Sequence, residues 1–273
     1  MSETDYSEAH GDLVAVLREA TLLSHAASGR ETTEWRVECG SYAFAKLCAH
    51  SLSVITLSPK PGNPMSGRLW DFSSICAITR AAVESYLALF YIAIDPISPE
   101  ERSFREAVWT FQAEHKRLAL LRLANSRSAQ LPALQQQVVR LQKAVVDHPY
   151  YSRVDPSKQG RIRKGELPIL ATNSELAERA GVSLAYYRAV YRFLSSYVHT
   201  YPYCVSQLAS FRAGDPEALR MIAIVLRYCL AFSSLGVRDF LRLFADLPAP
   251  PTQAQEIIDT WVFVAGQSGK NGA

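Results

Sequence analysis

Two pairs of ionisable side chains lie at helical spacing in largely apolar segments, and they are the residues best suited to chemistry. Arg80 and Glu84 are four residues apart in TRAAVESY, so a helix places both on one face. The surrounding residues are mostly apolar, which predicts a buried helix with this pair facing the interior or a cleft. Because a buried charge needs a partner, the pair is either a supporting part of a site or a structural ion pair.

The second pair is Arg192 and His199, in YRFLSSYVHTYP. Seven residues are close to two helical turns, so both side chains project from one face, about 10 Å apart along the axis. Ser195 lies between them, and Pro202 is predicted to end the helix just after His199. Arginine suits bidentate phosphate contacts and histidine moves protons near neutral pH. A capping histidine and a salt-bridged arginine are the structural alternative.

The spacing of the second pair leads to a family resemblance. Arg-x6-His is the upper length of the Arg-x(4–6)-His motif of the HEPN superfamily of helical nucleotide-binding proteins. Three segments together resemble bacterial HEPN-like proteins, which are suspected phage-defence or toxin relatives. They are RAAVESYLALFYI, REAVWTFQAEHKRL and ELAERAGVSLAYYRAVYRFLSSYVH, and the resemblance extends over about residues 69–245.

This resemblance implies an all-α fold and metal-independent cleavage of RNA, usually at the interface of a homodimer. It implies that Arg192 binds phosphate and that His199 is the acid/base. Phe193 departs from the pattern, because many HEPN motifs place a polar residue directly after the arginine. We expect Arg80, Glu84 and Ser195 to support the pair, and Arg80, Glu84, Arg192 and His199 to line one shared site in which Glu84 accepts from an arginine or histidine.

A third group of candidate residues is basic. The segment YYSRVDPSKQGRIRKGELP lies within a predicted loop, 147–173, and its residues Arg161, Arg163 and Lys164 are candidates for nucleic-acid binding. Clustered basic residues attract a phosphate backbone, and the two leading tyrosines are suited to stacking a base. A solvated charged loop is the alternative.

Two other functions remain open. One is a non-catalytic protein that binds a nucleotide or nucleic acid, or serves as a scaffold. The other is a DNA-binding regulator, because SELAERAGVSLAYYRAVYRF reads as a helix-turn-helix with Gly181 in the turn. Tyr187 stands where a compact aliphatic residue is wanted, and the second helix continues apolar beyond the length of a recognition helix. A plain corner leading into a core helix is therefore the preferred interpretation.

Motifs for other chemistries are missing from the sequence. It has no GxSxG elbow, no Rossmann GxGxxG, no HExxH, and no paired-cysteine zinc spacing. GRIRKGEL is not a P-loop, because Glu166 and Leu167 stand where Lys and Ser/Thr are required. We therefore expect no metal and no cofactor.

The elements that position these residues are predicted to be helices. Ser98 with Glu101 forms a capping box, and no segment alternates apolar and polar residues as a strand does. The predicted helices are 13–27, 31–57, 69–94, 98–123, 131–146, 215–244 and a short one from 252. The predicted fold is a single large all-α bundle. Its divisions are an N-terminal helical segment, a HEPN-like core and a C-terminal short helix and tail, at 1–68, 69–246 and 247–273.

Composition agrees with a folded intracellular protein. The 273 residues are 48% hydrophobic with a net charge of +3, which excludes disorder as the default and demands no anionic partner. Five cysteines without a CxxC pair, and a polar N-terminus, predict free thiols in the cytoplasm. Two long apolar segments carry central charges, so we expect core helices rather than membrane spans.

Overall fold

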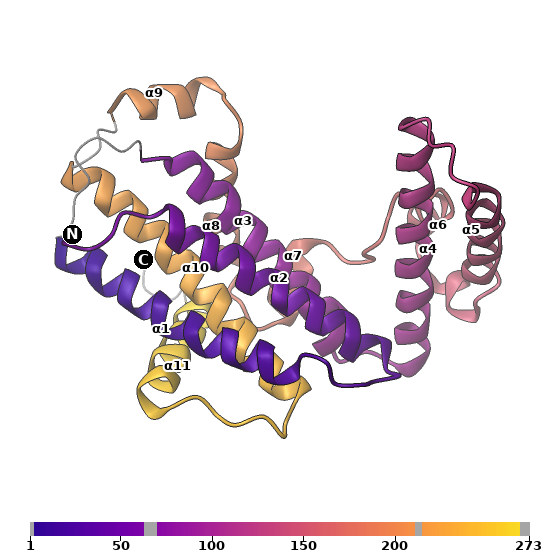
Figure 1. The fold of residues 1–273 in the computed structure, drawn as a ribbon, viewed down its shortest axis with the longest axis horizontal. Coiled ribbons are helices and arrows are strands. Elements are labelled where there is room, and N and C mark those ends of the chain that lie inside the picture. The colour runs from indigo at the N-terminus through magenta and orange to yellow at the C-terminus, as the bar shows by residue number, and fades with distance from the viewer. Residues whose placement is uncertain (1–2, 63–69, 211–214, 268–273) are drawn as a thin grey trace. The chain divides into compact units, whose positions relative to one another are not determined.

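The computed structural model describes residues 3–62, 70–210 and 215–267 (Figure 1). The chain is 78% helical, with eleven α-helices and no strand in those residues, which confirms the predicted all-α class. It divides into two compact units. Unit 1 comprises Met1–Asp95 and Asn173–Ala273, and unit 2 comprises Pro96–Thr172.

This division differs from the predicted one. The sequence predicted a single bundle with boundaries at 68 and 246, whereas unit 2 is a separate set of contacts inside the predicted 69–246 core. The physical reason is that unit 2 buries its own apolar side chains against one another. Its core consists of Phe104, Val108, Phe111, Leu118, Leu134, Val138, Val145, Val154 and Ile162.

Unit 1 is built around the long helix α10, which packs against α1, α2, α3 and α11 (Figure 1). Helix α3 also packs against α8, which carries the candidate Arg192. The unit's helices are α1 (Glu3–Ala27), α2 (Trp35–Leu57), α3 (Phe72–Leu89), the π-helix η1 (Phe90–Ile94), α7 (Asn173–Arg179), α8 (Leu184–Val198), α9 (Pro202–Ser210), α10 (Pro216–Leu243) and α11 (Thr252–Gln267).

Glycine allows α2 to approach its neighbours closely. A Cβ atom on Gly40 would lie 2.9 Å from the Cβ of Ala93 and 3.0 Å from Leu243 Cδ2. These distances are shorter than a relaxed carbon–carbon contact. Farther along α2, the rings of Phe44 and Phe240 stack with centroids 3.9 Å apart. The close approach explains why this part of the core is fully buried.

A buried carboxylate lies in the middle of unit 1. Asp239 of α10 is fully buried and accepts from Arg238 Nε at 2.8 Å, from Arg242 Nη1 at 3.1 Å and from the Tyr86 hydroxyl at 3.0 Å. Burial and the neighbouring Asp239 charge raise the pKa of Tyr86 well above its usual value. The hydroxyl therefore stays protonated and donates, and the carboxylate is satisfied by three partners.

Two helices of unit 1 are long and apolar enough to cross a membrane by length and composition. They are Phe72–Ile94 and Pro216–Leu243, and 67% of the apolar window of each is buried inside the protein. Core helices of soluble proteins pass the same test, so this property alone does not assign either helix to a membrane. The predicted helix start at residue 69 lies outside the described residues.

Unit 2 contains α4 (Pro99–Leu123), α5 (Leu131–Val146), the 3₁₀-helix η2 (Pro149–Arg153) and α6 (Pro156–Arg163). One half of the predicted capping box is formed, because the Ser98 hydroxyl accepts from the Glu101 backbone N–H at 3.1 Å. Helix α5 packs on α4, and α6 packs on α5. The α4 and α5 bounds agree with the predicted ones within a residue.

The predicted loop at 147–173 is wrong over much of its length, because it contains η2 and α6. The Asp155 carboxylate caps α6 by accepting from Ser157 N at 2.8 Å. Gly165, at φ +69°, ends it, with the Gly165 N–H bonded to the Ile162 carbonyl at 2.8 Å. A Cβ at Gly165 would also lie 2.4 Å from His115 Nδ1. The capping signals were present, but the segment is short and polar.

Candidate functional site

Arg80, Glu84 and Tyr191 form a closed cluster between α3 and α8. Arg80 Nε donates to Glu84 Oε1 at 3.1 Å, and Arg80 Nη2 donates to the Tyr191 hydroxyl at 2.7 Å. The same hydroxyl donates to Glu84 Oε1 at 3.1 Å. The Arg80 guanidinium carbon also lies 4.7 Å from the centroid of the Tyr191 ring, a cation–π distance. We call these three residues the paired cluster.

The protonation states of the paired cluster reinforce the contacts. Burial and the Glu84 carboxylate raise the pKa of Tyr191 above its usual value. Burial acts to lower the pKa of Arg80, but Tyr191 and Glu84 outweigh it and the pKa is raised. A neutral phenol therefore bridges a permanently charged guanidinium and a carboxylate. Glu84 accepts from an arginine as expected, and its other donor is Tyr191.

Arg192 and His199 are both exposed. Within the described residues, neither side chain makes a hydrogen bond or an ion pair, so neither joins the paired cluster by contact. His199 is the C-cap residue of α8, where Pro202 was predicted to end the helix. Its ring lies against Tyr201, with centroids 5.2 Å apart. The expectation that all four residues line one site stays a prediction.

A third cation extends the exposed line of α8. Arg188 precedes Arg192 by four residues, is exposed, and has no ion pair among the residues that the structure describes. At about 100° per residue, Arg188 and Arg192 project about 40° apart, and His199 follows at the end of the helix. We call these three residues the α8 strip. Sequence reasoning missed Arg188, although its i,i+4 spacing from Arg192 was visible.

Helix α8 brings the paired cluster and the α8 strip next to each other. At the same 100° per residue, Tyr191 lies about 100° from Arg192 around the helix, and Ser195 lies between the two. The Ser195 hydroxyl donates to the Tyr191 carbonyl at 2.6 Å, so its proton is already engaged. Ser195 can therefore offer only acceptor capacity to a ligand.

Phe193, the departure from the HEPN pattern, packs toward the protein. Its ring centroid is 6.4 Å from that of Phe72 and 5.7 Å from that of Tyr228, both nearly perpendicular. Edge-to-face aromatic pairs of this kind stabilise a core. The aromatic side chain therefore anchors α8 and leaves the exposed strip unaltered.

The basic residues at the end of α6 are also exposed. Arg161 and Arg163 lie in the last turn of α6 and Lys164 is its C-cap, on either side of the buried Ile162. Their side chains make no ion pair within the described chain. The Tyr150 hydroxyl donates to Glu101 Oε2 at 2.8 Å and the rings of both leading tyrosines are half-buried, and their base-stacking role stays a prediction.

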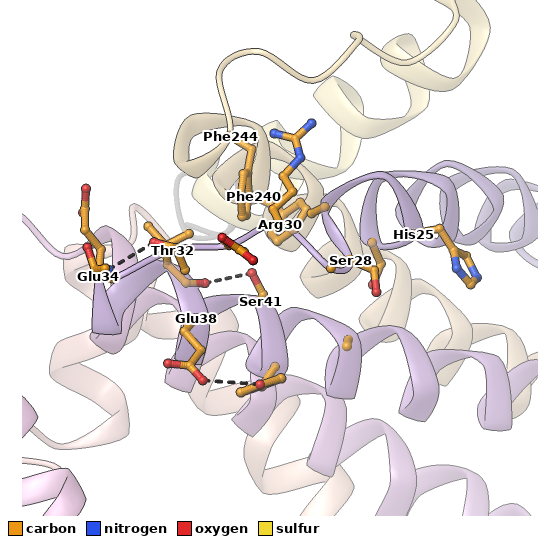
Figure 2. A pocket seen from close by; sticks show the side chains of 17 residues that line it. His25, Ser28, Arg30, Thr32, Glu34, Glu38, Ser41, Phe240 and Phe244 are labelled. Carbon is orange, nitrogen blue, oxygen red and sulfur yellow. Dashed lines mark hydrogen bonds between the residues drawn. The ribbon is translucent and has the colours of Figure 1, made fainter.

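Unit 1 also has an open cavity of about 1260 Å³, which the sequence did not predict (Figure 2). It lies between the end of α1, residues 28–34, the first turns of α2, and Phe240 and Phe244. The guanidinium of Arg30, which lines the cavity, already has partners. Arg30 Nη1 donates to Asp246 Oδ2 at 2.7 Å and its guanidinium lies 5.6 Å from the Phe244 ring centroid.

The turn before α8 has the geometry of a capped helix end. Gly181, at φ +82°, follows α7, and the Val182 N–H bonds to the Ala177 carbonyl at 2.9 Å. Tyr187 is buried on the side of α8 that packs inward, and burial together with Tyr191 raises its pKa to about 12. This turn therefore directs α8 into the core and leaves the α8 strip on its exposed side.

Comparison with known proteins places the chain in a family. No curated protein and no solved structure matches it. Among the described residues, no group of three or more His, Cys, Asp or Glu is arranged to hold a metal ion. A family model described as a family of unknown function (DUF5677) matches residues 39–215, a segment that includes α3, α8 and unit 2. The chain therefore belongs to the DUF5677 family.

Proposed function

We propose that the chain is a cytoplasmic RNA-binding protein of a defence or toxin type that cleaves RNA through Arg192 and His199 without a metal. The observation that carries this proposal is the α8 strip, in which two exposed arginines without an ion pair in the described chain lead to a histidine at the helix end. An exposed guanidinium free of a carboxylate is available to a phosphate. The HEPN-like spacing of Arg192 and His199 supports the same assignment.

The proposed reaction is an internal transesterification. The RNA 2′-hydroxyl attacks the adjacent phosphorus, its proton passes to the imidazole of His199, and the P–O5′ bond breaks. The leaving 5′ oxygen takes a proton from solvent, giving a 2′,3′-cyclic phosphate and a 5′-hydroxyl. Arg192 stabilises the negative charge that develops on the phosphoryl oxygens. In a homodimer, which the resemblance implies, the imidazolium of a second copy would supply that proton.

The α6 residues are proposed as a separate contact to the phosphate backbone. Arg161, Arg163 and Lys164 are exposed and without an ion pair in the described chain, whereas Arg153 pairs with Glu100 at 2.8 Å and Lys158 donates to the Leu170 carbonyl at 2.8 Å. Cationic side chains that contact phosphates displace the counterions condensed on the nucleic acid, which favours binding. The three free residues are therefore the part of the segment suited to RNA.

A second candidate function is RNA binding without cleavage. A general base is normally held in place by a hydrogen bond to its other nitrogen. The His199 ring contacts Tyr201 but makes no hydrogen bond within the described residues. This observation favours a strip that recognises phosphate and leaves the backbone intact.

Cleavage of a labelled RNA in excess chelator tests the proposal. The wild type should cut RNA, leave cyclic-phosphate ends, and spare a DNA of the same sequence, because the nucleophile is the 2′-hydroxyl. His199→Ala and Arg192→Ala should each lower the rate by about 100-fold or more. Because both side chains are exposed, the melting temperature should change little. His25→Ala and Arg18→Ala, at exposed positions of α1, are matched controls.

Two other results separate the candidates. If the wild type binds RNA but never cuts it, and Arg192→Ala weakens that binding, the non-catalytic function is correct. If the wild type neither binds nor cuts RNA, or if His199→Ala and Arg192→Ala lower the melting temperature without changing activity, the α8 strip has no role in RNA recognition.

A further inference from the structure

An exposed aromatic patch follows the α8 strip directly along the chain. Tyr201, which directly precedes α9, is 65% exposed, and Tyr203, in the first turn of α9, is 55% exposed. Val198 and Val205 flank them and are also exposed. Four large apolar residues exposed within eight positions are unusual on a soluble surface. We call the two tyrosines, with the two valines, the aromatic patch.

The two tyrosines are placed by different neighbours. The ring of Tyr201 lies 5.2 Å from that of His199, with the ring planes 35° apart. The ring of Tyr203 lies 5.9 Å from that of Tyr197, which is itself buried in α8. Tyr203 therefore packs on a buried ring of the core, and Tyr201 packs beside the proposed acid/base, His199. Both keep more than half of their surface open.

We propose that Tyr201 and Tyr203 stack on bases of single-stranded RNA whose phosphates contact the α8 strip. This inference rests on the proposed function and names its substrate class. Aromatic faces next to a line of free cations have the two properties of a single-strand platform, which holds the backbone by charge and the bases by stacking. In a duplex the base faces are stacked on each other, so only an unpaired strand offers them to tyrosine.

Charge complementarity identifies RNA as the occupant of this patch. Arg188, Arg192 and His199 approach it along α8 without a carboxylate partner in the described residues. A purely apolar partner would leave those cations unneutralised beside the contact, whereas a nucleic-acid strand meets the cations with phosphates and the tyrosines with bases. Self-association of the chain through the aromatic patch is the competing occupant that the experiment must detect.

Equilibrium binding of a 2′-O-methylated oligouridylate, alone and as a duplex with its complement, tests the inference. This probe has no free 2′-hydroxyl, so cleavage cannot confuse the measurement. The wild type should prefer the single strand by at least about 10-fold, and Tyr201→Ala/Tyr203→Ala should remove most of that preference. Tyr201→Phe/Tyr203→Phe keeps both aromatic faces and should bind like the wild type. Tyr42→Ala, at a tyrosine 67% exposed on α2, is the matched control.

The results separate stacking from the function on which it rests. If Arg192→Ala weakens binding but Tyr201→Ala/Tyr203→Ala does not, the stacking role is wrong and RNA recognition stands. If the wild type does not bind either probe, both fail. Sedimentation of the same variants detects the competitor: loss of a dimer on Tyr201→Ala/Tyr203→Ala, with unchanged affinity for the single strand, would show that the patch is a self-interface and overturn the inference.

Discussion

Helix α8 carries two kinds of charged surface side by side. On one edge, Tyr191 closes a hydrogen-bonded cluster with Arg80 and Glu84 of α3. About 100° around the helix, Arg192 projects into solvent, and His199 is exposed at the helix end; neither side chain makes a hydrogen bond or ion pair in the described chain. Two arginines beside this helix therefore differ: Arg80 of α3 is paired, whereas Arg192 of α8 is exposed.

The difference teaches that, of these two arginines, the one withdrawn from water is paired and the exposed one is left available to a ligand. The side chain of Arg80 is 26% exposed, and a cation removed from water to that extent is stabilised when a carboxylate and a hydroxyl replace the lost solvent. Arg192 keeps its water and needs no internal partner. We therefore assign the paired cluster to the joining of α3 and α8, and the α8 strip to recognition.

The largest expected effect on stability is at Asp239 in the interior of unit 1, where the buried carboxylate has three hydrogen-bond partners. Asp239→Asn removes the charge that Arg238, Arg242 and Tyr86 all contact, and should lower the stability of unit 1 by about 3–5 kcal/mol. The measurement is urea unfolding followed by tryptophan fluorescence in a Trp109→Phe background. That background removes the single tryptophan of unit 2, so the remaining signal reports unit 1.

The matched control is Asp246→Asn in the same background. Asp246 pairs with Arg30 at 2.7 Å, but its side chain is 69% exposed, so its loss should change stability by less than about 1 kcal/mol. Equal effects of the two substitutions would show that burial does not set the strength of these charge pairs, and the comparison would fail.

A smaller effect is expected at the paired cluster. Tyr191→Phe removes the hydroxyl that accepts from Arg80 and donates to Glu84 but retains the ring beneath the guanidinium. The cost should be about 0.5–1.5 kcal/mol, toward the lower end because the cluster is partly exposed. Thermal melting measures it, and RNA affinity should stay within about two-fold of the wild type. Weakened RNA binding at unchanged stability would instead make Tyr191 part of the recognition surface.

Much of the fold followed from local signals in the sequence. Ser98 and Asp155 both cap helices, but only the first was identified, because α4 continues with a long apolar periodicity and α6 has one buried residue, Ile162. Helix α9 was missed because Pro202 was taken only as a stop, whereas it also begins the next helix. Unit 2 was missed because its independence depends on contacts between segments distant in sequence.

The candidate site was predictable only in part. The i,i+4 spacing placed Glu84 with Arg80 because both lie on one helix. Tyr191 joined them from another helix, and nothing local in the sequence specifies that α8 packs on α3 at that register. Exposure of Arg192 and His199 likewise depends on how α8 is rotated against the core, which its buried residues Tyr187 and Leu194 determine.

The salt dependence of RNA binding tests the central claim most directly. Affinity for the 2′-O-methylated single strand is measured over a range of salt for the wild type, for Arg188→Ala/Arg192→Ala, and for Arg18→Ala/Lys46→Ala, which removes two exposed cations from α1 and α2. Each lost phosphate contact flattens the slope of log affinity against log salt by about 0.7. We predict a slope about 1.4 smaller for the α8 variant and an unchanged slope for the control. An unchanged slope for Arg188→Ala/Arg192→Ala, or equal flattening by the control pair, would contradict the assignment of the α8 strip to RNA.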